Sequence, residues 1–372
     1  MPKVSKKKEA IAVDSSNGVP TVMKAAVYRG RGSMQVEWVE VPAVEPGELL
    51  VRVEACGVCN TDVKKIQKDL LPPPRIFGHE TAGTIVRLGE GVEGWQVGDP
   101  VVVFHHIPCG QCFYCQRNVF AQCPTYKKVG VTAGFEASGG GFAEYVRIRD
   151  WVVKRGVVRI PPGVSFEQAS FVEPVNTCLK AIRKAAVEPW ESVLILGQGT
   201  IGLLFLMLAR RAGAQVYVSE PVPERRERSL RYGAAQAYDP KAVNLSKEMK
   251  AVTEGRGVDL AIVAAAGPSL VEQAIQAVRP GGRIELFAQT SPDEVLQVNA
   301  ASVCVEEKTL LGSYSAAIDM QEEAAQLVFS GELPVSELIT HRLGLSEIKE
   351  AIQLASSQSG RSLKVMLQPQ LA

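Results

Sequence analysis

Four cysteines fall within fifteen residues of a chain that holds eight, and this cluster constrains the fold more than any other feature. The spacing is Cys-x2-Cys-x2-Cys-x7-Cys, with the thiols at Cys109, Cys112, Cys115 and Cys123. Such a set can surround one tetrahedral Zn²⁺ ion, with Zn–S bonds of about 2.3 Å and no open coordination position. A closed site of this kind stabilises a loop and performs no chemistry. The spacing therefore predicts a structural zinc site.

The length and composition predict a globular protein of about two domains. At 372 residues the chain exceeds the roughly 250–300 residues at which a single core stops growing. Hydrophobic residues make up 46% and charged residues 22%, which is ordinary for such proteins. The net charge is +1, and no apolar run reaches the roughly 18–20 residues that cross a bilayer. We therefore expect neither a nucleic acid nor a membrane as partner.

The first residues, 1–22, form a polar segment with a lysine run and without the apolar centre of a signal peptide. We expect this segment to be a disordered tail, with the fold beginning near Met23. Without a secretory signal, clustered cysteines indicate metal binding in a reducing compartment rather than disulfides. The sequence thus predicts a cytoplasmic protein.

Two patterns of secondary structure follow one another along the chain. In the first part, short runs broken by Gly and Pro predict a barrel-like β domain with strands at 24–28, 48–54, 83–88, 101–104 and 142–147. From Glu173 on, strands alternate with helices, which predicts βαβ units around a parallel sheet. The expected strands are 192–196, 215–219, 258–263 and 283–287, and the expected helices are 200–211, 224–232 and 269–278. Helices at 320–330 and 347–356 and a strand at 363–367 are expected to return to the first domain. The predicted domains are therefore 23–172 with 316–372, and 173–315.

A Gly-x-Gly-x-x-Gly motif, Gly197-Gln-Gly199-Thr200-Ile201-Gly202, lies between a predicted strand and a predicted helix. Gly197 permits a tight turn, Gly199 lets the backbone approach a pyrophosphate, and Gly202 allows close packing of helix on strand. Thr200 opens the helix, whose free N–H groups and partial positive charge favour phosphate. Glycines also serve plain turns, but this context predicts a dinucleotide-binding site.

The choice of dinucleotide depends on Glu220, which ends the next predicted strand at close to the expected distance of about 20 residues. Its carboxylate can accept hydrogen bonds from an adenosine ribose and repel a 2′-phosphate, which favours NAD. Arg225 and Arg226 lie just beyond and could instead pair with a 2′-phosphate, although such arginines are also typical of a solvated helix face. NAD is the predicted cofactor, with NADP as the alternative.

Three further motifs complete an ordered set: Gly-Val-Cys59, Gly-His79-Glu80 and Glu173-Pro. With the four-cysteine cluster and the glycine motif, they follow the order found in zinc-dependent medium-chain alcohol dehydrogenases. From Met23 to the C-terminus the chain resembles this family, in particular its sorbitol and threonine dehydrogenase branch. The resemblance implies an α/β protein with a β-rich part: a GroES-like, β-barrel-type catalytic domain beside a Rossmann domain with a doubly wound parallel sheet.

The resemblance also implies a second, catalytic zinc ion. Cys59, His79 and Glu173 would be ligands, and Glu80 would be a direct ligand or a carboxylate that exchanges with water near the metal. Three protein ligands with one open position let zinc polarise an alcohol oxygen. Taken singly, His79 is typical of a structural histidine, Cys59 of an inert thiol and Glu173 of a helix-starting acid. Their common context favours metal binding, so two zinc ions per chain are predicted.

Further roles follow from position in the resembled family. Thr61 matches a hydroxyl that takes the substrate proton, and its alternative is the N-cap of the next helix. Lys64 replaces a histidine that continues this relay in many members, so the proton could leave through Lys64, a water or a ribose hydroxyl. Ile201 would support the nicotinamide ring, and Lys364 would reach the cofactor phosphates.

His105 and His106 precede the four-cysteine cluster, where the resemblance places one wall of the substrate pocket. Neighbours on a strand face opposite ways, so at most one of them is expected to point inward. A surface position for His106 is the alternative.

These features predict an enzyme that transfers hydride reversibly between a secondary alcohol or small polyol, such as sorbitol, and NAD. The alternatives are a threonine 3-dehydrogenase or a simple secondary-alcohol dehydrogenase, either of them able to use NADP. A non-catalytic dinucleotide-binding protein is the alternative from another class. The resemblance further implies a homodimer or homotetramer.

Overall fold

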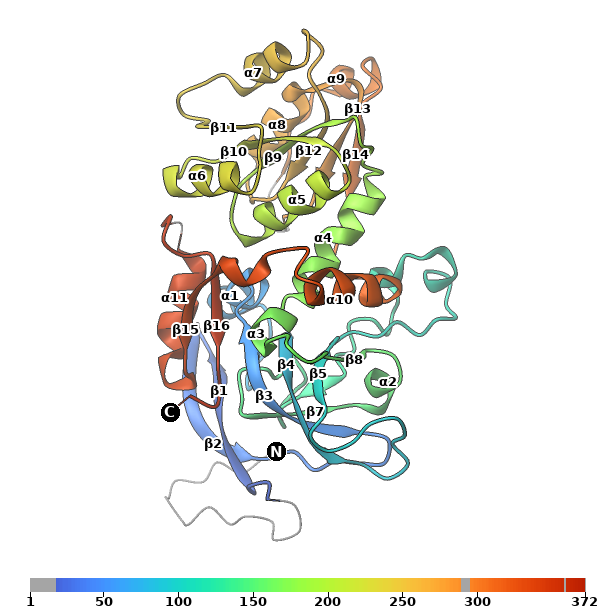
Figure 1. The fold of residues 1–372 in the computed structure, drawn as a ribbon, viewed down its shortest axis with the longest axis vertical. Helices are drawn as coiled ribbons and strands as arrows, with labels where there is room; N and C mark the ends of the chain where they lie inside the picture. Colours follow the sequence, from blue (N-terminus) through green and yellow to red (C-terminus); the bar gives the residue numbers. More distant parts are fainter. Residues whose placement is uncertain (1–17, 289–294, 358, 372) are drawn as a thin grey trace. The chain divides into compact units, whose positions relative to one another are not determined.

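The computed structural model describes residues 18–288, 295–357 and 359–371, and these form two compact units (Figure 1). Unit 1 runs up to Glu173 and includes 317–357 and 362–371. Unit 2 is formed by the described part of Pro174–Ala316 together with Ser359–Arg361. Within the described ranges, none of the helices has the length and apolar character required to cross a bilayer.

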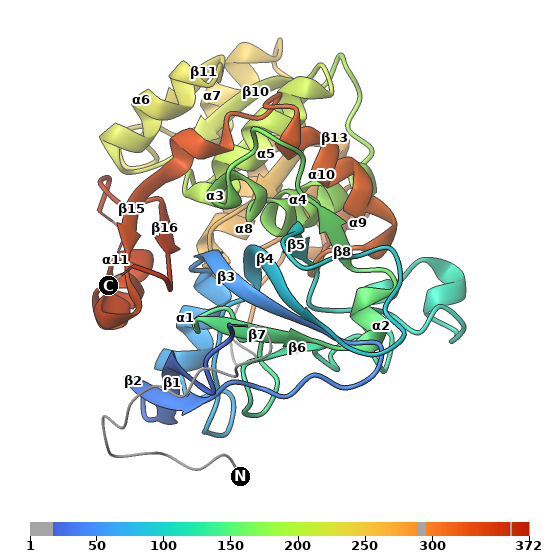
Figure 2. The ribbon, with the colours of Figure 1, turned by 60° about the horizontal axis from the view of Figure 1, so that its bottom comes forward.

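Unit 1 is built on a sheet whose central strand is β3 (Leu49–Gly57). This strand pairs antiparallel with β4 (Glu80–Leu88), β7 (Tyr145–Ile148) and β16 (Lys364–Leu367), and Figure 2 shows β3, β4 and β7 side by side. The described strands that complete the sheet are β5 (Pro100–Val103), β6 (Val131–Thr132), β8 (Val157–Arg159) and β15 (Ile339–Leu343). A separate hairpin joins β1 (Val22–Gly30) to β2 (Ser33–Glu40). Nearly all of β3 is buried, with only Arg52 exposed, as expected for a central strand that is covered on both faces.

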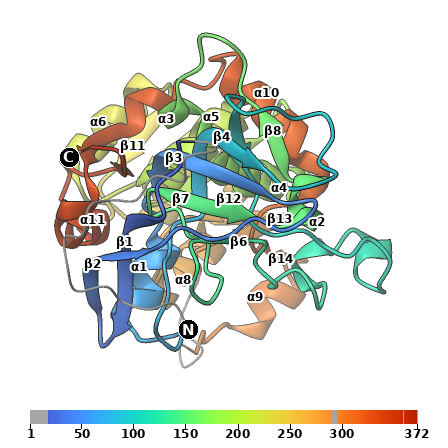
Figure 3. The same ribbon diagram turned by 90° about the horizontal axis from the view of Figure 1, so that it is seen from below.

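Short helices surround this sheet. Ser165 caps α3, because its side chain accepts the N–H of Gln168 at 3.1 Å. The helices of unit 1 are α1 (Asn60–Gln67), α2 (Asp150–Val153), α3 (Phe166–Ala169), α10 (Gln321–Phe329) and α11 (Ile348–Ser356). Its 3-10 turns are η1 (Cys115–Arg117), η2 (Phe120–Gln122), η3 (Ile318–Met320), η4 (Val335–Leu338) and η5 (Leu345–Glu347). Figure 3 shows that the segment after β5, with the four cysteines, extends away from the strands of unit 1.

Most of the predicted tail, residues 1–17, lies outside the described residues. The last part of it is ordered: Val19 is buried, the carbonyl of Thr21 accepts the N–H of Val41 at 3.0 Å, and β1 begins at Val22. The first strand thus begins one residue before the expected start at Met23, and Val19 ahead of it is also buried. An apolar side chain that finds a buried place offsets the entropy of ordering these few residues.

Unit 2 contains a parallel sheet with the strand order β11-β10-β9-β12-β13-β14. Numbered within the unit, this order is 3-2-1-4-5-6, which is the doubly wound arrangement of dinucleotide-binding domains. Right-handed crossovers should place α5 (Thr200–Arg211) and α6 (Pro223–Arg231) on one face and α8 (Pro268–Ala277) on the other. The strands are β9 (Ser192–Leu196), β10 (Gln215–Ser219), β11 (Gln236–Tyr238), β12 (Val258–Val263), β13 (Val278–Leu286) and β14 (Thr309–Gly312).

The helices of unit 2 cover both faces of this sheet. Residues 202–209 of α5 are all buried, which explains why the sequence of this helix is apolar all round. The helices are α5 (Thr200–Arg211), α6 (Pro223–Arg231), α7 (Leu245–Val252), α8 (Pro268–Ala277) and α9 (Ala300–Cys304), and α4 (Val172–Lys184) runs from unit 1 into unit 2.

The predicted element boundaries differ most at short strands. The ranges predicted for β9, α5, β10 and β12 agree residue for residue, because each is a compact apolar segment between turn signals. Among the elements that were not predicted from the sequence are the strands β2, β11, β14 and β15 and the helices α4 and α7. The segment Ser359–Arg361 was assigned to the first domain but belongs to unit 2, where Arg225 donates to the carbonyl of Ser359 at 3.3 Å.

Candidate active site and metal centres

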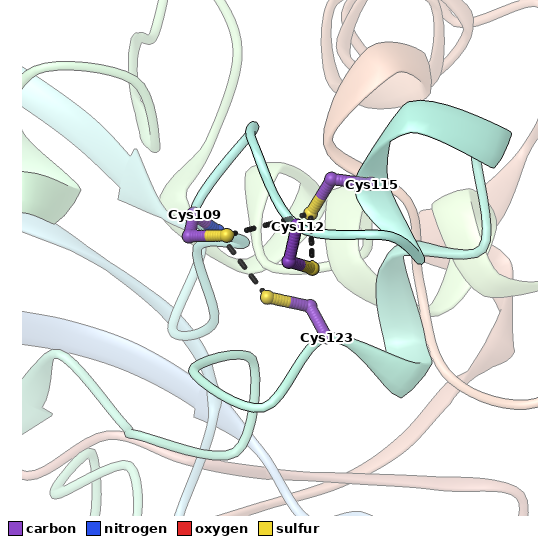
Figure 4. Close-up of side chains that lie close together, drawn as sticks. All are labelled: Cys109, Cys112, Cys115 and Cys123. Carbon is purple, nitrogen blue, oxygen red and sulfur yellow. Dashed lines mark hydrogen bonds between the residues drawn. The ribbon is translucent and has the colours of Figure 1, made fainter.

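The four thiols of the predicted structural zinc site converge (Figure 4). The Sγ atom of Cys115 lies 3.6 Å from that of Cys112 and 3.9 Å from that of Cys109. The N–H of Cys109 points at the Sγ atom of Cys123, 3.4 Å away. A tetrahedron with Zn–S bonds of about 2.3 Å has sulfur–sulfur edges of about 3.8 Å. The sulfurs therefore already have the spacing of a zinc cage, and all of them are free of disulfides.

Local hydrogen bonds prepare one of these thiols for a cation. Burial alone would raise the pKa of Cys123, but the N–H of Cys109 and the hydroxyl and N–H of Thr125 lower it to about 6. Burial raises the pKa of Cys115 to about 12. Metal binding at this cluster would therefore release at least one proton, as expected for thiolate ligands.

A second group of ligands forms at one end of β4 in unit 1. The ligand atoms of Cys59, His79 and Glu80 all lie within 4.8 Å of one another. Cys59 is the N-cap of α1, and its Sγ atom accepts the N–H of Thr61 at 3.4 Å. One thiolate, one imidazole and one carboxylate are the donor types that hold catalytic zinc. These three residues fit a zinc ion.

Two glycines make room for this group. Gly78 has φ +96°, and a Cβ there would lie 2.5 Å from the ring of Phe142, so the turn that presents His79 requires glycine. A Cβ on Gly57 would lie 1.9 Å from the Oε2 atom of Glu80. Glycine at this position therefore leaves the space that the Glu80 carboxylate occupies.

Asp62 orients the imidazole of His79. The Nδ1 atom of His79 lies 3.1 Å from Oδ1 of Asp62, which is fully buried. A hydrogen bond at Nδ1 leaves Nε2 for a metal. Burial opposes a charge on His79, but the Asp62 carboxylate and the Cys59 thiolate raise its pKa well above the usual value. Asp62 was not among the predicted site residues. Its position three residues after Cys59 nevertheless puts both side chains on one face of α1.

Glu173 and Lys364 also lie near this group. Glu173 is buried in the first turn of α4, and burial raises its pKa to about 7 against the opposing effect of His79. It is not among the residues whose ligand atoms converge, so its role as a ligand stays a prediction. The ammonium group of Lys364 is buried and contacts the carboxylate of Glu80, whereas the sequence assigned it to cofactor phosphates.

The residues of the predicted proton relay lie on α1. Thr61 is half-buried beside Cys59, and the N-cap is Cys59 rather than Thr61. Lys64 lies one turn further along the helix. The catalytic roles of Thr61, Lys64 and Glu80 stay predictions.

His105 lies beside the ligand group, whereas His106 is half-buried against the ring of Tyr126, so the expectation that at most one of the two points inward stays a prediction. The two rings lie with centroids 4.0 Å apart, and the ring of His105 lies 4.8 Å from that of His79. The Nδ1 atoms of both are buried and have no hydrogen-bond partner among the described residues. Strand alternation does not apply here, because β5 ends at Val103.

In unit 2 the glycine motif has the geometry of a phosphate cradle. Gly197 has φ +96°, and a Cβ on Gly202 would lie 1.9 Å from the carbonyl oxygen of Gly197. A Cβ on Gly199 would meet no described atom within 4 Å, so this side of the loop is open. Gly199 is also the N-cap of α5, which leaves the N–H groups of Thr200 and Ile201 at the open side. This cradle fits a dinucleotide pyrophosphate.

Glu220 lies at the end of β10 and is fixed by two backbone groups. Its Oε2 atom accepts the N–H of Gln198 at 2.7 Å, and its Oε1 atom accepts the N–H of Val222 at 3.0 Å. Arg226 donates to the carbonyl oxygen of Glu220 at 2.7 Å, and Arg225 lies on the same helix, α6. The predicted ribose-binding carboxylate is therefore held rigidly beside the glycine motif.

Comparisons with known proteins agree with this fold and these sites. Residues 45–162 match the model of the alcohol dehydrogenase GroES-like domain, and residues 200–330 match that of the zinc-binding dehydrogenases. The chain is 33% identical to an L-threonine 3-dehydrogenase of Pyrococcus horikoshii (91% of this chain, 95% of the relative) and 28% identical to a sorbitol dehydrogenase of Bacillus subtilis (94% and 98%). A zinc-binding dehydrogenase of Sinorhizobium meliloti, solved with NADP bound, superimposes with a TM-score of 0.84 at 29% identity (94% and 99%).

The two units and their candidate metal centres thus define a zinc-binding dehydrogenase. The chain belongs to the zinc-dependent medium-chain alcohol dehydrogenase family, which confirms the resemblance, the fold class and the zinc and nicotinamide cofactors predicted from the sequence. It is an oxidoreductase of alcohols or polyols.

Proposed function

We propose that the enzyme oxidises a secondary alcohol group of a small polyol, such as sorbitol, reversibly with NAD. The convergence of Cys59, His79 and Glu80 within 4.8 Å carries this proposal. These residues would hold a zinc ion, and the chemistry it would supply is Lewis-acid polarisation of an alcohol oxygen. Glu173, buried nearby at the start of α4, would complete the ligand set.

The protein's own groups would orient the substrate and move its proton. Asp62 holds the ring of His79, so the ligand keeps one orientation. The hydroxyl of Thr61, next to Cys59, would take the proton of the alcohol, because a hydroxyl can accept one proton and donate another. Lys64, one turn along α1, would pass this proton to solvent. The glycine motif would hold the nicotinamide cofactor that accepts the hydride.

NAD is favoured over NADP by the surroundings of Glu220. Its fixed carboxylate would accept hydrogen bonds from an adenosine ribose and repel a 2′-phosphate. Arg226 donates a hydrogen bond to the carbonyl oxygen of Glu220, and its Nη1 atom lies 3.5 Å from Oδ2 of Asp239. The Sinorhizobium relative that binds NADP supports the alternative, in which Arg225 would pair with the phosphate.

A hydroxyl-rich substrate is favoured by the buried Nδ1 atoms of His105 and His106. A neutral imidazole offers one donor and one acceptor, which suits a hydroxyl group. Threonine carries a carboxylate and an ammonium group that need charged partners, whereas Lys364 and Glu80 pair with each other. Threonine 3-dehydrogenase activity is the second candidate, favoured by the 33% identity to the Pyrococcus enzyme.

The experiment is a panel of sorbitol, xylitol, 2,3-butanediol, 2-propanol and L-threonine, each assayed with NAD and with NADP for formation of the reduced cofactor. We expect the highest kcat/KM with a polyol and NAD, and loss of turnover after dialysis against a chelator. A preference for threonine would replace the polyol assignment. Cofactor binding without turnover of any alcohol would support the non-catalytic alternative.

We further propose a cytoplasmic homodimer or homotetramer. The cysteines are all free thiols, which suits a reducing compartment. In the described part of the sheet, β14 is an edge strand, and a second copy could pair with it. Sedimentation equilibrium would give the oligomeric state.

A further inference from the structure

Gln198 is the second residue of the glycine motif, and its side chain is fully buried. A buried amide must find hydrogen-bond partners, because an unpaired polar group in the interior destabilises the fold. Cofactor binding needs only the backbone at this position. The side chain therefore requires a separate explanation.

The amide of Gln198 connects the glycine motif to α6. Its Nε2 atom donates to the carbonyl oxygen of Gly197 at 3.0 Å. Its Oε1 atom lies 3.1 Å from the hydroxyl of Ser229, a fully buried residue of α6. The reverse orientation of the amide would bring two acceptors, Oε1 and the Gly197 carbonyl, together. The orientation described is therefore the stable one, and the Ser229 hydroxyl donates to Oε1.

The backbone of Gln198 makes the third connection. Its N–H donates to Oε2 of Glu220 at 2.7 Å, so one residue contacts the glycine motif, the end of β10 and α6. The Ser229 hydroxyl also lies 2.9 Å from the carbonyl oxygen of Arg225, so its single proton is shared between the two acceptor oxygens. These bonds form one chain from the carboxylate of Glu220, through Gln198 and Ser229, to the backbone of Arg225.

We propose that Gln198 is a positioning residue for the adenosine half of the cofactor. Through Ser229 it fixes α6, and with it Arg225, at a set distance from Glu220 and the pyrophosphate cradle. This inference rests on the proposed binding of NAD at that site. The side chains of Gln198 and Ser229 are fully buried, so they would act on the cofactor through Glu220 and the backbone of the glycine motif.

Two variants of the full-length, zinc-loaded protein test the inference. Gln198→Met keeps the approximate length of the side chain and removes both of its hydrogen bonds, and Ser229→Ala removes only the connection to α6. Loss of one or two buried hydrogen bonds should raise the Kd of ADP-ribose, measured by calorimetry, by roughly three- to tenfold. KM for NAD should rise by the same factor, while kcat at saturating NAD stays within about twofold.

Thr253→Val is the matched control in the same unit. The hydroxyl of Thr253 is buried and bonds the carbonyl of Met249, four residues earlier, as that of Ser229 bonds Arg225. This control should lower the melting temperature and leave the Kd of ADP-ribose unchanged. If Gln198→Met does not fold, Ser229→Ala decides the question.

The outcomes separate this inference from the proposed function. Failure of the unsubstituted protein to bind ADP-ribose would overturn both. Binding by the unsubstituted protein that is equally strong in Ser229→Ala and Gln198→Met would overturn the inference alone. Lower melting temperatures in these variants with an unchanged Kd would likewise assign Gln198 to stability only.

Discussion

The ammonium group of Lys364 contacts the carboxylate of Glu80, and both side chains are buried in unit 1. Burial alone would lower the pKa of Lys364, but the charge of Glu80 raises it. The two residues come from neighbouring parts of one sheet: Glu80 opens β4, Lys364 opens β16, and β3 pairs with both strands. This ion pair connects Glu80, a candidate zinc ligand, to β16 near the C-terminus.

Lys364→Met should destabilise the protein by about 3 kcal/mol, because it leaves the Glu80 carboxylate buried without its partner. KM for NAD should stay unchanged if Lys364 serves Glu80, and should rise if Lys364 reaches the cofactor phosphates. Lys308→Met is the control, since its buried ammonium bonds the carbonyl of Ile275 at 2.7 Å in unit 2. Urea unfolding and initial rates provide the two measurements. A stability equal to that of the unsubstituted protein would contradict the role of the ion pair.

Asp62→Ala should weaken zinc binding at the Cys59 centre by roughly 10- to 100-fold, because the imidazole of His79 loses the acceptor that orients it. Competition with a chromophoric chelator measures this affinity. Asp69→Ala is the control, since Asp69 follows the same helix and pairs with the hydroxyl of Tyr28. Equal zinc affinity in the two variants would show that Asp62 does not position the ligand.

The sequence predicted those parts of the sites that depend on local spacing. The four cysteines lie on one short segment, and the glycine motif joins one strand to one helix, so their geometry follows from the local chain. The order of motifs then identified Cys59, His79 and Glu80 as partners. The parallel sheet of unit 2 also followed from regular alternation of strands and helices, whereas its strand order is seen only in the structure.

Contacts between distant residues could not be predicted in this way. Lys364 and Glu80 are brought together only by the pairing of β3 with β4 and β16. Strand alternation could not place His105 and His106, because β5 ends before them at Val103. No role was predicted for Gln198, because the glycine motif allows any side chain at this position. Only the fold shows that the hydroxyl of Ser229 lies next to its amide.

Cys112→Ser should remove one zinc ion per chain and lower the melting temperature of the protein by roughly 5–10 °C, the effect of losing about 2–3 kcal/mol in a domain of this size. The reason is that the four cysteines form the centre of the small cluster on which this loop packs, together with Phe120, Ala121 and Tyr126. Elemental analysis and calorimetry measure the two effects, and Cys304→Ser, at the exposed end of α9, is the control. Loss of turnover with an unchanged melting temperature would contradict a purely structural role.

Glu285 on β13 gives unit 2 a pH-dependent stability. Its side chain is fully buried, and neither carboxylate oxygen has a hydrogen-bond partner among the described residues. Burial raises its pKa to about 7, while Lys184 and Lys180 of α4 and the N–H of Ser313 act in the opposite direction. The folded protein therefore holds a proton that the unfolded chain releases at lower pH.

Because the pKa in the folded state is above that in the unfolded chain, stability should fall as the pH rises from about 4.5 to 7 and then level off. The decrease should be of the order of 3 kcal/mol across this window. Glu285→Gln cannot ionise and should lose this slope, whereas Glu254→Gln, at an exposed acid of the same unit, should keep it. Urea unfolding at a series of pH values measures the difference. An equal slope in Glu285→Gln and the unsubstituted protein would mean that Glu285 is already ionised in the folded state, stabilised by the two lysines.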